Sequence, residues 1–120
     1  MADAILLRND AGGIATLTLN APGSFNALSD AMLAAMATEL AALAVDASVR
    51  VVVLKAAGKA FCAGHDLKEM QAARSASDQG AAYFADLFAR CAAVMQALQV
   101  LPQPVVAQVQ GIATAAGCQL

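Results

Sequence analysis

The sequence has few aromatic and few charged side chains. It contains no Trp, one Tyr and four Phe, and only 13% of its 120 residues are charged. The seven Lys and Arg are scattered singly and the net charge is -2, so nucleic acid is not an expected partner. Hydrophobic residues make up 60%, many of them alanine, so the chain must bury most of its length around a core of small side chains.

Cysteine is also scarce, and long apolar runs are absent. Cys62, Cys91 and Cys118 are widely spaced without a CxxC pair, which is typical of reduced thiols in a cytoplasmic protein rather than a disulfide framework or a zinc site. No run of 18 or more strongly apolar residues occurs, and Met1 to Asn9 contains the acidic Asp3 with no basic segment ahead of its apolar residues. Neither a membrane span nor a signal peptide is therefore expected.

Periodicity in the first part of the chain predicts a hairpin followed by a helix. The segments Ile5 to Asn9 and Ile14 to Leu19 flank a turn with two glycines, and the second segment alternates like a half-buried strand. A loop containing Pro and Gly follows at Asn20 to Asn26. Ser29 can then cap a helix that ends near Asp46. The apolar stripe of this helix is Leu33, Met36, Leu40 and Leu43.

The remaining chain predicts strands alternating with helices. Val49 to Leu54 is rich in β-branched residues with little alternation, which is typical of a strand covered on both faces. After a small-residue loop, a second long helix is stopped by Pro102 and Pro104, and a further strand is expected at Val105 to Val109. One side of that helix carries Phe84, Leu87, Phe88, Cys91, Met95 and Leu98. This order predicts a single α/β domain with right-handed crossovers.

Two segments share the pattern Ala-Gly-x-x-Leu directly after a strand-like run. They are Ala63 to Leu67 and Ala116 to Leu120. Small side chains let a ligand approach the backbone, so two such turns could hold one oxyanion between two N–H donors. Tight packing in an alanine-rich chain is the commoner explanation of the same pattern. A phosphate loop is excluded, because Val53 and Ala60 stand where GxxxxGK[ST] needs Gly and Ser or Thr, and no GxGxxG occurs.

A metal site beside the first of these turns is a further alternative. His65 and Glu69 are four residues apart with Asp66 between them, a spacing that metal ligands on a helix can have. His65 is the only histidine, however, and no complete ligand set is apparent, so no metal is expected. A polar helix start explains these residues more simply, since Asp66 suits the positive end of a helix. Cys62 and Cys118 are interpreted as small buried fillers.

Three longer segments resemble one protein family in order and spacing. NAPGSFNALS begins at Asn20, VRVVVLKAAGKAFCAGHDLKEM at Val49 and PQPVVAQVQGIATAAGCQL at Pro102. Together they resemble the amino-terminal half of the crotonase superfamily, the enoyl-CoA hydratase/isomerase family. The His65 position and the ending TAAGCQL are most similar to the subgroup called enoyl-CoA hydratase domain-containing protein 3. The resemblance implies an α/β spiral of ββα units of the ClpP/crotonase type, of which residues 1–120 form the amino-terminal part, and a homotrimer or hexamer.

The resemblance also implies a site for an acyl-CoA thioester, with coenzyme A bound as part of the substrate and no separate cofactor. Family members hold the thioester carbonyl between two backbone N–H groups, which by motif fall on His65 and Ala116 and would stabilise an enolate. The imidazole of His65 would shape the acyl pocket. The other residues expected to contact the substrate are Asn26, Ala27, Leu28, Ala63, Gly64, Asp66, Leu67, Lys68 and Gly117.

The sequence departs from the family at the first catalytic glutamate. Hydratases use two glutamates as general acid and base, and the first aligns with Gln119, which can orient a water molecule but cannot transfer a proton. The second would lie beyond Leu120, with the later turns of the spiral, so a truncated domain is expected. Three functions stay open: an acyl-CoA hydratase or isomerase, a non-catalytic acyl-CoA binder, and an interaction module or inactive fragment that depends on a partner.

Overall fold

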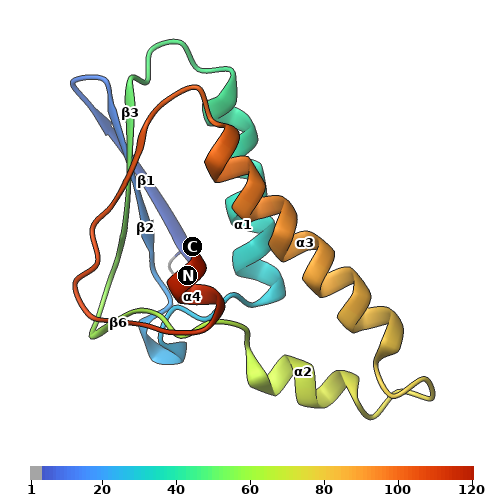
Figure 1. The fold of residues 1–120 in the computed structure, drawn as a ribbon. Helices are drawn as coiled ribbons and strands as arrows, with labels where there is room; N and C mark the ends of the chain where they lie inside the picture. Colours follow the sequence, from blue (N-terminus) through green and yellow to red (C-terminus); the bar gives the residue numbers. More distant parts are fainter. Residues whose placement is uncertain (1–3) are drawn as a thin grey trace.

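The computed structural model describes residues 4–120, and in it a mixed sheet is covered by helices (Figure 1). The sheet has the strand order β1-β2-β3-β5, in which β1 and β2 are antiparallel and β3 is parallel to both β2 and β5. The predicted α/β architecture is confirmed. The signal-peptide interpretation rests partly on residues 1–3, which lie outside the described residues. The strands of this sheet are β1 (Leu6–Ala11), β2 (Ile14–Leu19), β3 (Val51–Ala56) and β5 (Val105–Ala107).

The hairpin of β1 and β2 is the element that local sequence predicts best. Its turn uses Gly12 and Gly13 at φ of 60° and 81°, values that glycine adopts without steric cost. The Gly13 carbonyl accepts hydrogen bonds from the N–H groups of Arg50 and Val51, at 2.7 and 3.2 Å. The hairpin turn therefore also fixes the start of β3, which is why this strand begins and ends two residues later than predicted.

A second, two-stranded sheet was not predicted. It pairs β4 (Ala60–Cys62) with β6 (Ile112–Ala113) in parallel. Strands of three and two residues are too short to show a period in sequence. Gly111 lies so close to β4 that a Cβ atom would collide with the Lys59 carbonyl oxygen. This pairing brings the chain after β4 beside the chain after β6, and these are the two turns that share the Ala-Gly pattern.

The helices begin and end at recognisable signals. Ser29 caps α1, because its hydroxyl oxygen accepts a hydrogen bond from the Met32 N–H at 3.1 Å, as predicted. The carboxylate of Asp66 caps α2 in the same way. Helix α1 packs against α3, and α2 packs against the start of α3 (Figure 1). The helices are α1 (Asp30–Ala44), α2 (Leu67–Ala73), α3 (Ala81–Val100) and α4 (Ala116–Gln119), with a 3-10 turn at Pro22–Ser24.

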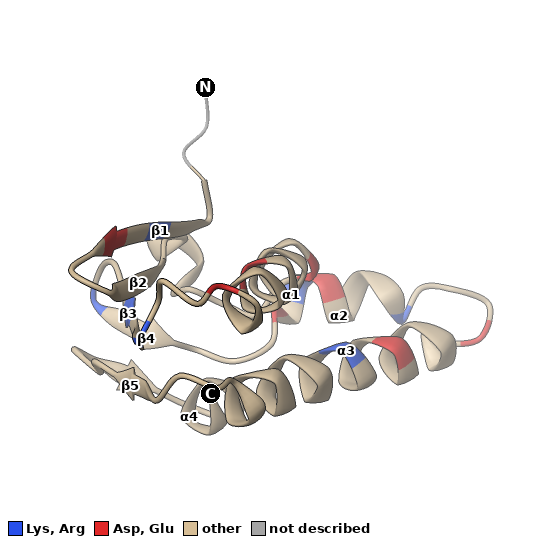
Figure 2. Ribbon diagram, turned by 90° about the horizontal axis from the view of Figure 1, so that it is seen from above, with Lys and Arg blue, Asp and Glu red and all other residues tan. Residues whose placement is uncertain are grey.

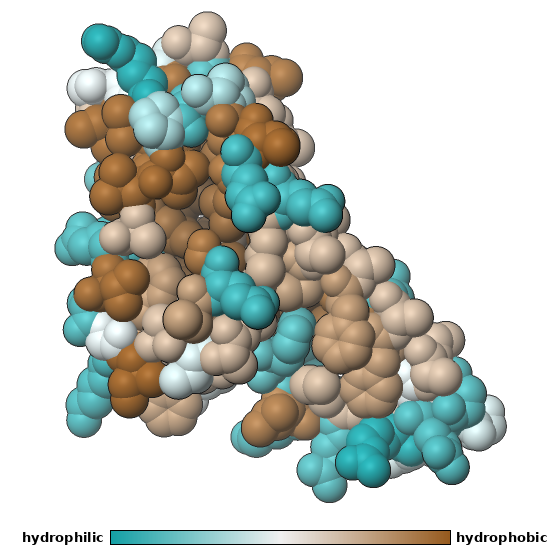
Figure 3. Space-filling model, in the orientation of Figure 1, coloured by the Kyte–Doolittle hydropathy of each residue, from teal (hydrophilic) through white to brown (hydrophobic). Residues whose placement is uncertain are grey.

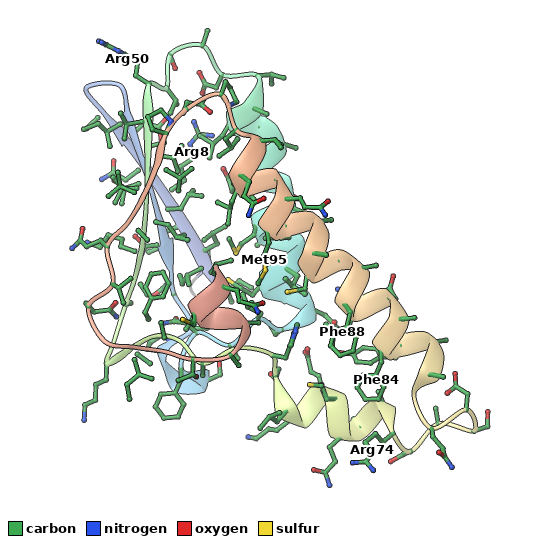
Figure 4. The ribbon with its side chains drawn as sticks, in the orientation of Figure 1. Arg8, Arg50, Arg74, Phe84, Phe88 and Met95 are labelled. Carbon is green, nitrogen blue, oxygen red and sulfur yellow. The ribbon has the colours of Figure 1, made fainter. Side chains whose placement is uncertain are left out.

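One apolar core lies between the main sheet and the α1 and α3 helices. The predicted stripe of α1 is buried throughout. The predicted stripe of α3 is correct for Leu87, Cys91 and Leu98, but Phe88 is 51% exposed and Val94 is buried in its place within the core. The reason is that the Phe88 ring lies between α3 and α2, against the imidazole of His65 (Figure 4).

Two predictions about burial were wrong. In β3, Val52 and Leu54 are buried while Val51 and Val53 are half-buried, so only one face of the strand is fully covered by the described residues. The run of valines reflects β propensity rather than burial on both faces. Cys118 is exposed, because α4 turns only Gly117 toward β4. Cys62 is buried as predicted.

Charged residues do not gather on one face of the molecule (Figure 2). The largest cluster is that of Arg8 on β1, whose guanidinium contacts the carboxylates of Asp10 at 2.8 Å, Asp46 at 2.9 Å and Glu39 at 3.4 Å. Hydrogen bonds from Ser48 and from the Arg8 guanidinium hold the pKa of Asp46 below its usual range. The cluster joins β1 to the second half of α1 and to the turn that follows this helix.

Apolar atoms are exposed over the strands (Figure 3), along the side on which the β5 and β6 segment runs (Figure 1). Within that segment Val106, Val109 and Ile112 are more than half exposed. By length and composition alone, α3 could also cross a bilayer, with 22% of its apolar window buried within the described residues. A single such helix is weak evidence for a membrane span, because core helices of soluble proteins have the same composition.

Candidate active site

The loop before α1 is held in place by the side chain of Asn26. This side chain is completely buried, and its residue adopts a left-handed φ of 54°. Its Oδ1 accepts a hydrogen bond from the Ala21 N–H at 2.8 Å, and its Nδ2 donates to the carbonyl oxygens of Ala57 and Ala60, both at 2.9 Å. All three hydrogen bonds are internal, so in the structure the Asn26 side chain connects its loop to the chain around β4.

The first Ala-Gly turn follows β4 and is bound to the same loop. The Gly64 carbonyl accepts from the Leu28 N–H at 2.7 Å, and the Ala63 N–H donates to the Phe25 carbonyl at 3.1 Å. Gly64 has a φ of 94°, which an L-residue with a side chain rarely adopts. Asp66 then begins α2. The turn is therefore fixed on both sides, with the N–H group of His65 between the two fixed points.

The second Ala-Gly turn follows β6 and lies against the first. The Thr114 N–H donates to the Cys62 carbonyl at 3.1 Å, and its hydroxyl donates to the Ala63 carbonyl at 3.3 Å. Ala115 has a φ of 51°, a strained value for a residue other than glycine. A Cβ atom placed on Gly64 would lie 3.2 Å from the Ala115 Cβ and 3.4 Å from the Ala116 nitrogen. The two turns are thus in direct contact.

Several backbone donors at this contact have no acceptor within residues 4–120. They include the N–H groups of His65 and Ala116, and also those of the flanking residues Leu67 and Ala115. Gly117, next to Ala116, must be a glycine because a Cβ atom would collide with the Cys62 carbonyl oxygen. Close packing at Gly117 and a positive φ at Gly64 together bring into contact the two turns that carry the His65 and Ala116 donors.

A cavity of about 650 Å³ lies beside the first turn. Among the residues expected to contact substrate, those that line it are Ala27, Ala63, His65, Asp66, Leu67 and Lys68. Asn26, Leu28 and Gly64 are buried beneath this wall, while Ala116, Gly117 and Gln119 belong to the neighbouring α4 and do not line it. The structure therefore gathers the first group around one space, and the roles of all these residues stay predictions.

Other lining residues were missed by sequence reasoning. They are Gly23, Ser24, Phe25, Met70 and Ala115. Phe25 is 59% exposed and could have been suspected, because a large aromatic residue in a turn seldom serves the core. Nothing in the sequence indicates the role of Ala115, since alanine does not predict a positive φ. Met70 lies on the second turn of α2, and only the position of α2 over the cavity shows that it faces the same space.

The imidazole of His65 is held at the wall of the cavity by Phe88. The two rings meet edge to face with centroids 5.6 Å apart, and Phe88 in turn stacks on Phe84 at 6.3 Å. Figure 4 shows both phenylalanines on α3 lying between that helix and α2. Burial lowers the pKa of His65, so its ring is neutral at pH 7. The Nδ1 atom is buried without a hydrogen-bond partner.

Polar residues around the turn have identifiable structural partners. The Glu69 carboxylate accepts from the Asp30 N–H at 2.8 Å and so links α2 to the start of α1. Asp30 also accepts from the Tyr83 hydroxyl at 3.2 Å and from Arg90 at 2.8 Å. Within residues 4–120 no three potential metal ligands cluster. Burial raises the pKa of the Cys62 thiol, which disfavours a thiolate nucleophile there.

Comparison with known proteins gives the same family as the motifs. The family model described as enoyl-CoA hydratase/isomerase matches residues 9–120. Enoyl-CoA hydratase domain-containing protein 3, mitochondrial, of Xenopus laevis is 42% identical over 108 residues, which are 90% of this chain and 35% of that protein. The crystal structure of an enoyl-CoA hydratase of Mycobacterium smegmatis is similar with a TM-score of 0.90 and 58% identity, over 98% of this chain and 44% of that one.

The crystal structure of human enoyl-CoA hydratase domain-containing protein 3 is similar with a TM-score of 0.87 and 37% identity, over 97% of this chain and 44% of that one. The chain thus spans about a third of the curated relative and less than half of each solved structure, in their amino-terminal part. The expected crotonase fold is confirmed for that part. Because the family model covers nearly the whole chain, this protein belongs to the enoyl-CoA hydratase/isomerase family, whose members bind acyl-CoA substrates.

Proposed function

We propose that this chain carries the thioester-binding part of an acyl-CoA hydratase or isomerase. In this proposal the thioester oxygen lies between the N–H groups of His65 and Ala116, and the acyl-CoA occupies the cavity beside them. Donors aimed at a developing negative charge bind the transition state more strongly than the substrate, and this difference is what accelerates the reaction. The species stabilised would be the enolate of the thioester.

The observation that supports this proposal is the pair of free donors at the contact of the two turns. A buried backbone N–H without an acceptor is uncommon in a folded protein, and because His65 and Ala116 are half-buried, a ligand oxygen is a fitting acceptor for both. The cavity of about 650 Å³ lies within the usual size range for small-molecule sites. The backbone, not a side chain, provides the donors, so the proposal is independent of the His65 imidazole.

The proton transfer needs groups other than these donors. Gln119 can hold a water molecule through its amide, but it cannot act as general acid or base. It is exposed on α4 and makes no side-chain hydrogen bond within the described residues. The proposal therefore gives Gln119 an orienting role at most.

The decisive variant is Gly64→Ala, measured in the protein at the length at which its native source makes it. The added Cβ would meet the Ala115 side chain at 3.2 Å and would strain the backbone at a φ of 94°, so the two donors should move apart. Losing one oxyanion donor reduces kcat by about 10²-fold to 10³-fold. We expect hydration of crotonyl-CoA, followed by the loss of its absorbance, to fall by about 10²-fold.

Gly12→Ala is the matched control for this variant. Gly12 also has a positive φ, of 60°, but a Cβ there meets nothing within 4 Å and lies in the hairpin turn of β1 and β2. Both variants bear the cost of a left-handed alanine, about 1–2 kcal/mol. An activity loss in Gly64→Ala alone supports the proposal, whereas equal, near-native rates in the two variants contradict it.

A non-catalytic acyl-CoA binder is the second candidate, and the glutamine at position 119 favours it. A protein with the oxyanion donors and without proton-transferring carboxylates would bind thioesters without converting them. This candidate predicts measurable affinity for butyryl-CoA by isothermal titration and no hydration of crotonyl-CoA. Robust turnover by the unmodified protein would exclude it. Activity gained by Gln119→Glu would show that the missing carboxylate is what limits the reaction.

A further inference from the structure

The His65 imidazole is the one polar side chain of the cavity wall that has a buried nitrogen without a hydrogen-bond partner among the described residues. Its Nδ1 is buried without a partner, and its Nε2 makes no hydrogen bond within residues 4–120. Gln103 Oε1 is the other buried side-chain atom of this kind, but its amide nitrogen already donates to the Leu43 carbonyl at 2.7 Å, away from the cavity. His65 alone therefore combines an unsatisfied polar group with a cavity position.

The position of the ring is set by packing rather than by a polar partner. Phe88 contacts the imidazole edge to face, with ring centroids 5.6 Å apart. The backbone next to His65 is fixed by the hydrogen bond from the Leu28 N–H to the Gly64 carbonyl. Of the two ring nitrogens only Nδ1 is buried, so Nε2 is the one that can be reached. A ring held in this way has one nitrogen packed inside the protein and one accessible, and the residue itself lines the cavity.

The protonation of the ring follows from the same burial. A buried N–H without an acceptor is rarer in proteins than a buried acceptor without a donor, so we assign the proton of the neutral ring to Nε2. His65 then offers an N–H donor to whatever lies beside it. A purely hydrocarbon acyl group would leave that donor desolvated and unpaired, and such a mismatch is what polar pockets discriminate against.

We propose that the His65 side chain determines specificity, by selecting acyl-CoA thioesters whose acyl group carries an oxygen acceptor within reach of the imidazole. This inference rests on the proposed function, because it takes the cavity to be the acyl site. The oxygen would accept a hydrogen bond from Nε2. Apolar lining residues such as Ala27, Ala63 and Met70 would contact the remaining acyl carbons, while Asp66 and Lys68 also line the cavity.

The test compares two ligands that differ by a single atom. In 3-methoxypropanoyl-CoA an ether oxygen replaces one methylene of pentanoyl-CoA, so the ligands have nearly the same size and differ in one acceptor. Dissociation constants of both are measured by isothermal titration for the unmodified protein, His65→Leu and His65→Gln, with the recovered ligands checked by mass spectrometry. The ratio of the two constants within each variant removes differences in general binding, and comparing that ratio between variants removes the difference in hydration of the two ligands.

One hydrogen bond in the site should change this ratio by about threefold to tenfold. We expect the ratio of dissociation constants to favour the ether in the unmodified protein by that factor relative to His65→Leu. His65→Gln keeps an N–H donor in its amide and should show part of the same preference. Met70→Leu is the control, because Met70 lines the same cavity without a polar hydrogen and should leave the ratio unchanged. If His65→Leu does not fold, His65→Phe takes its place as the apolar variant. Its ratio of dissociation constants is then compared with those of His65→Gln and the unmodified protein.

The outcomes separate this inference from the proposed function. Equal ratios in the unmodified protein and the apolar His65 variant, with both ligands bound, would refute the specificity role and leave the acyl-CoA site standing. Failure of both ligands to bind the unmodified protein would contradict the proposed function itself. A changed ratio in Met70→Leu of the same size would show that cavity shape, not the imidazole, makes the selection.

Discussion

Replacing Asn26 with alanine should lower the free energy of unfolding by about 4 kcal/mol. The substitution removes the three internal hydrogen bonds that join the loop before α1 to Ala21, Ala57 and Ala60, at 2.8 to 2.9 Å. Each such bond contributes about 1 kcal/mol net. Alanine is also less suited than asparagine to a φ of 54°, which adds about 1 kcal/mol. Domains of this size are stable by about 5–15 kcal/mol, so a folded variant is still expected.

The assay is urea unfolding followed by circular dichroism, with Asn20→Ala as the control. Asn20 lies in the same loop but makes one exposed side-chain hydrogen bond, to the Ala4 carbonyl at 2.9 Å, and its loss should cost about 0.5 kcal/mol or less. A loss below about 1.5 kcal/mol for Asn26→Ala, with an unchanged slope in urea, would refute the structural role. Native stability combined with lost affinity for butyryl-CoA would instead support the direct substrate contact that the family resemblance implies for Asn26.

Two further predictions concern the site. Burial lowers the folded-state pKa of His65 below its usual 6.5, so the unfolded chain binds this proton more readily and the free energy of unfolding should decrease as the pH falls below about 6.5. His65→Gln should lack this decrease between pH 7.5 and 5.5. An identical pH dependence of the free energy of unfolding in both proteins would contradict the prediction. Gly117→Ala should destabilise by about 1–3 kcal/mol because its Cβ collides with the Cys62 carbonyl, whereas Gly23→Ala, with nothing within 4 Å, should be neutral in the same urea assay.

Local sequence signals predict the elements that are long enough to show them. The two-glycine turn predicts the hairpin, Ser29 predicts the start of α1, and Pro102 predicts where α3 stops. The pairing of β4 with β6 escapes such reasoning, because it depends on contacts between segments about 50 residues apart in the chain. Burial of β3 was overestimated for a related reason, since a run of valines gives the strand but not the number of covered faces.

The candidate site was predictable as a set of positions and less so as a geometry. The repeated Ala-Gly pattern and the family resemblance indicate two turns with backbone donors, and β4 and β6 bring those turns together. The roles of individual side chains were harder to predict. From the sequence Asn26 is expected to be a loop residue near a ligand, but its side chain makes three internal hydrogen bonds. The partnerless nitrogen of His65 depends on Phe88, which lies 23 positions away and was expected in the core.

The strain at the two turns has a physical connection to the free donors. Ala115 holds a φ of 51° and Gly64 one of 94°, and a position of this kind occupied by a residue other than glycine costs of order 1–3 kcal/mol. The fold maintains them through the Thr114 bonds to Cys62 and Ala63. Unpaired N–H groups add to this cost, and a ligand oxygen that accepts both hydrogen bonds recovers that part of the free energy while the strain stays in place.

The recovery is largest for an acceptor that carries negative charge, because hydrogen bonds to an ionised oxygen are roughly twice as strong as those to a neutral one. A neutral thioester oxygen between the two donors would therefore bind less strongly than the enolate oxygen formed from it. The fixed turns need not reorganise when the charge appears, since their geometry exists before any ligand binds. We therefore expect an acyl-CoA analogue with a permanently anionic oxygen to bind more tightly than butyryl-CoA, and Gly64→Ala to reduce that difference rather than the affinity for coenzyme A itself.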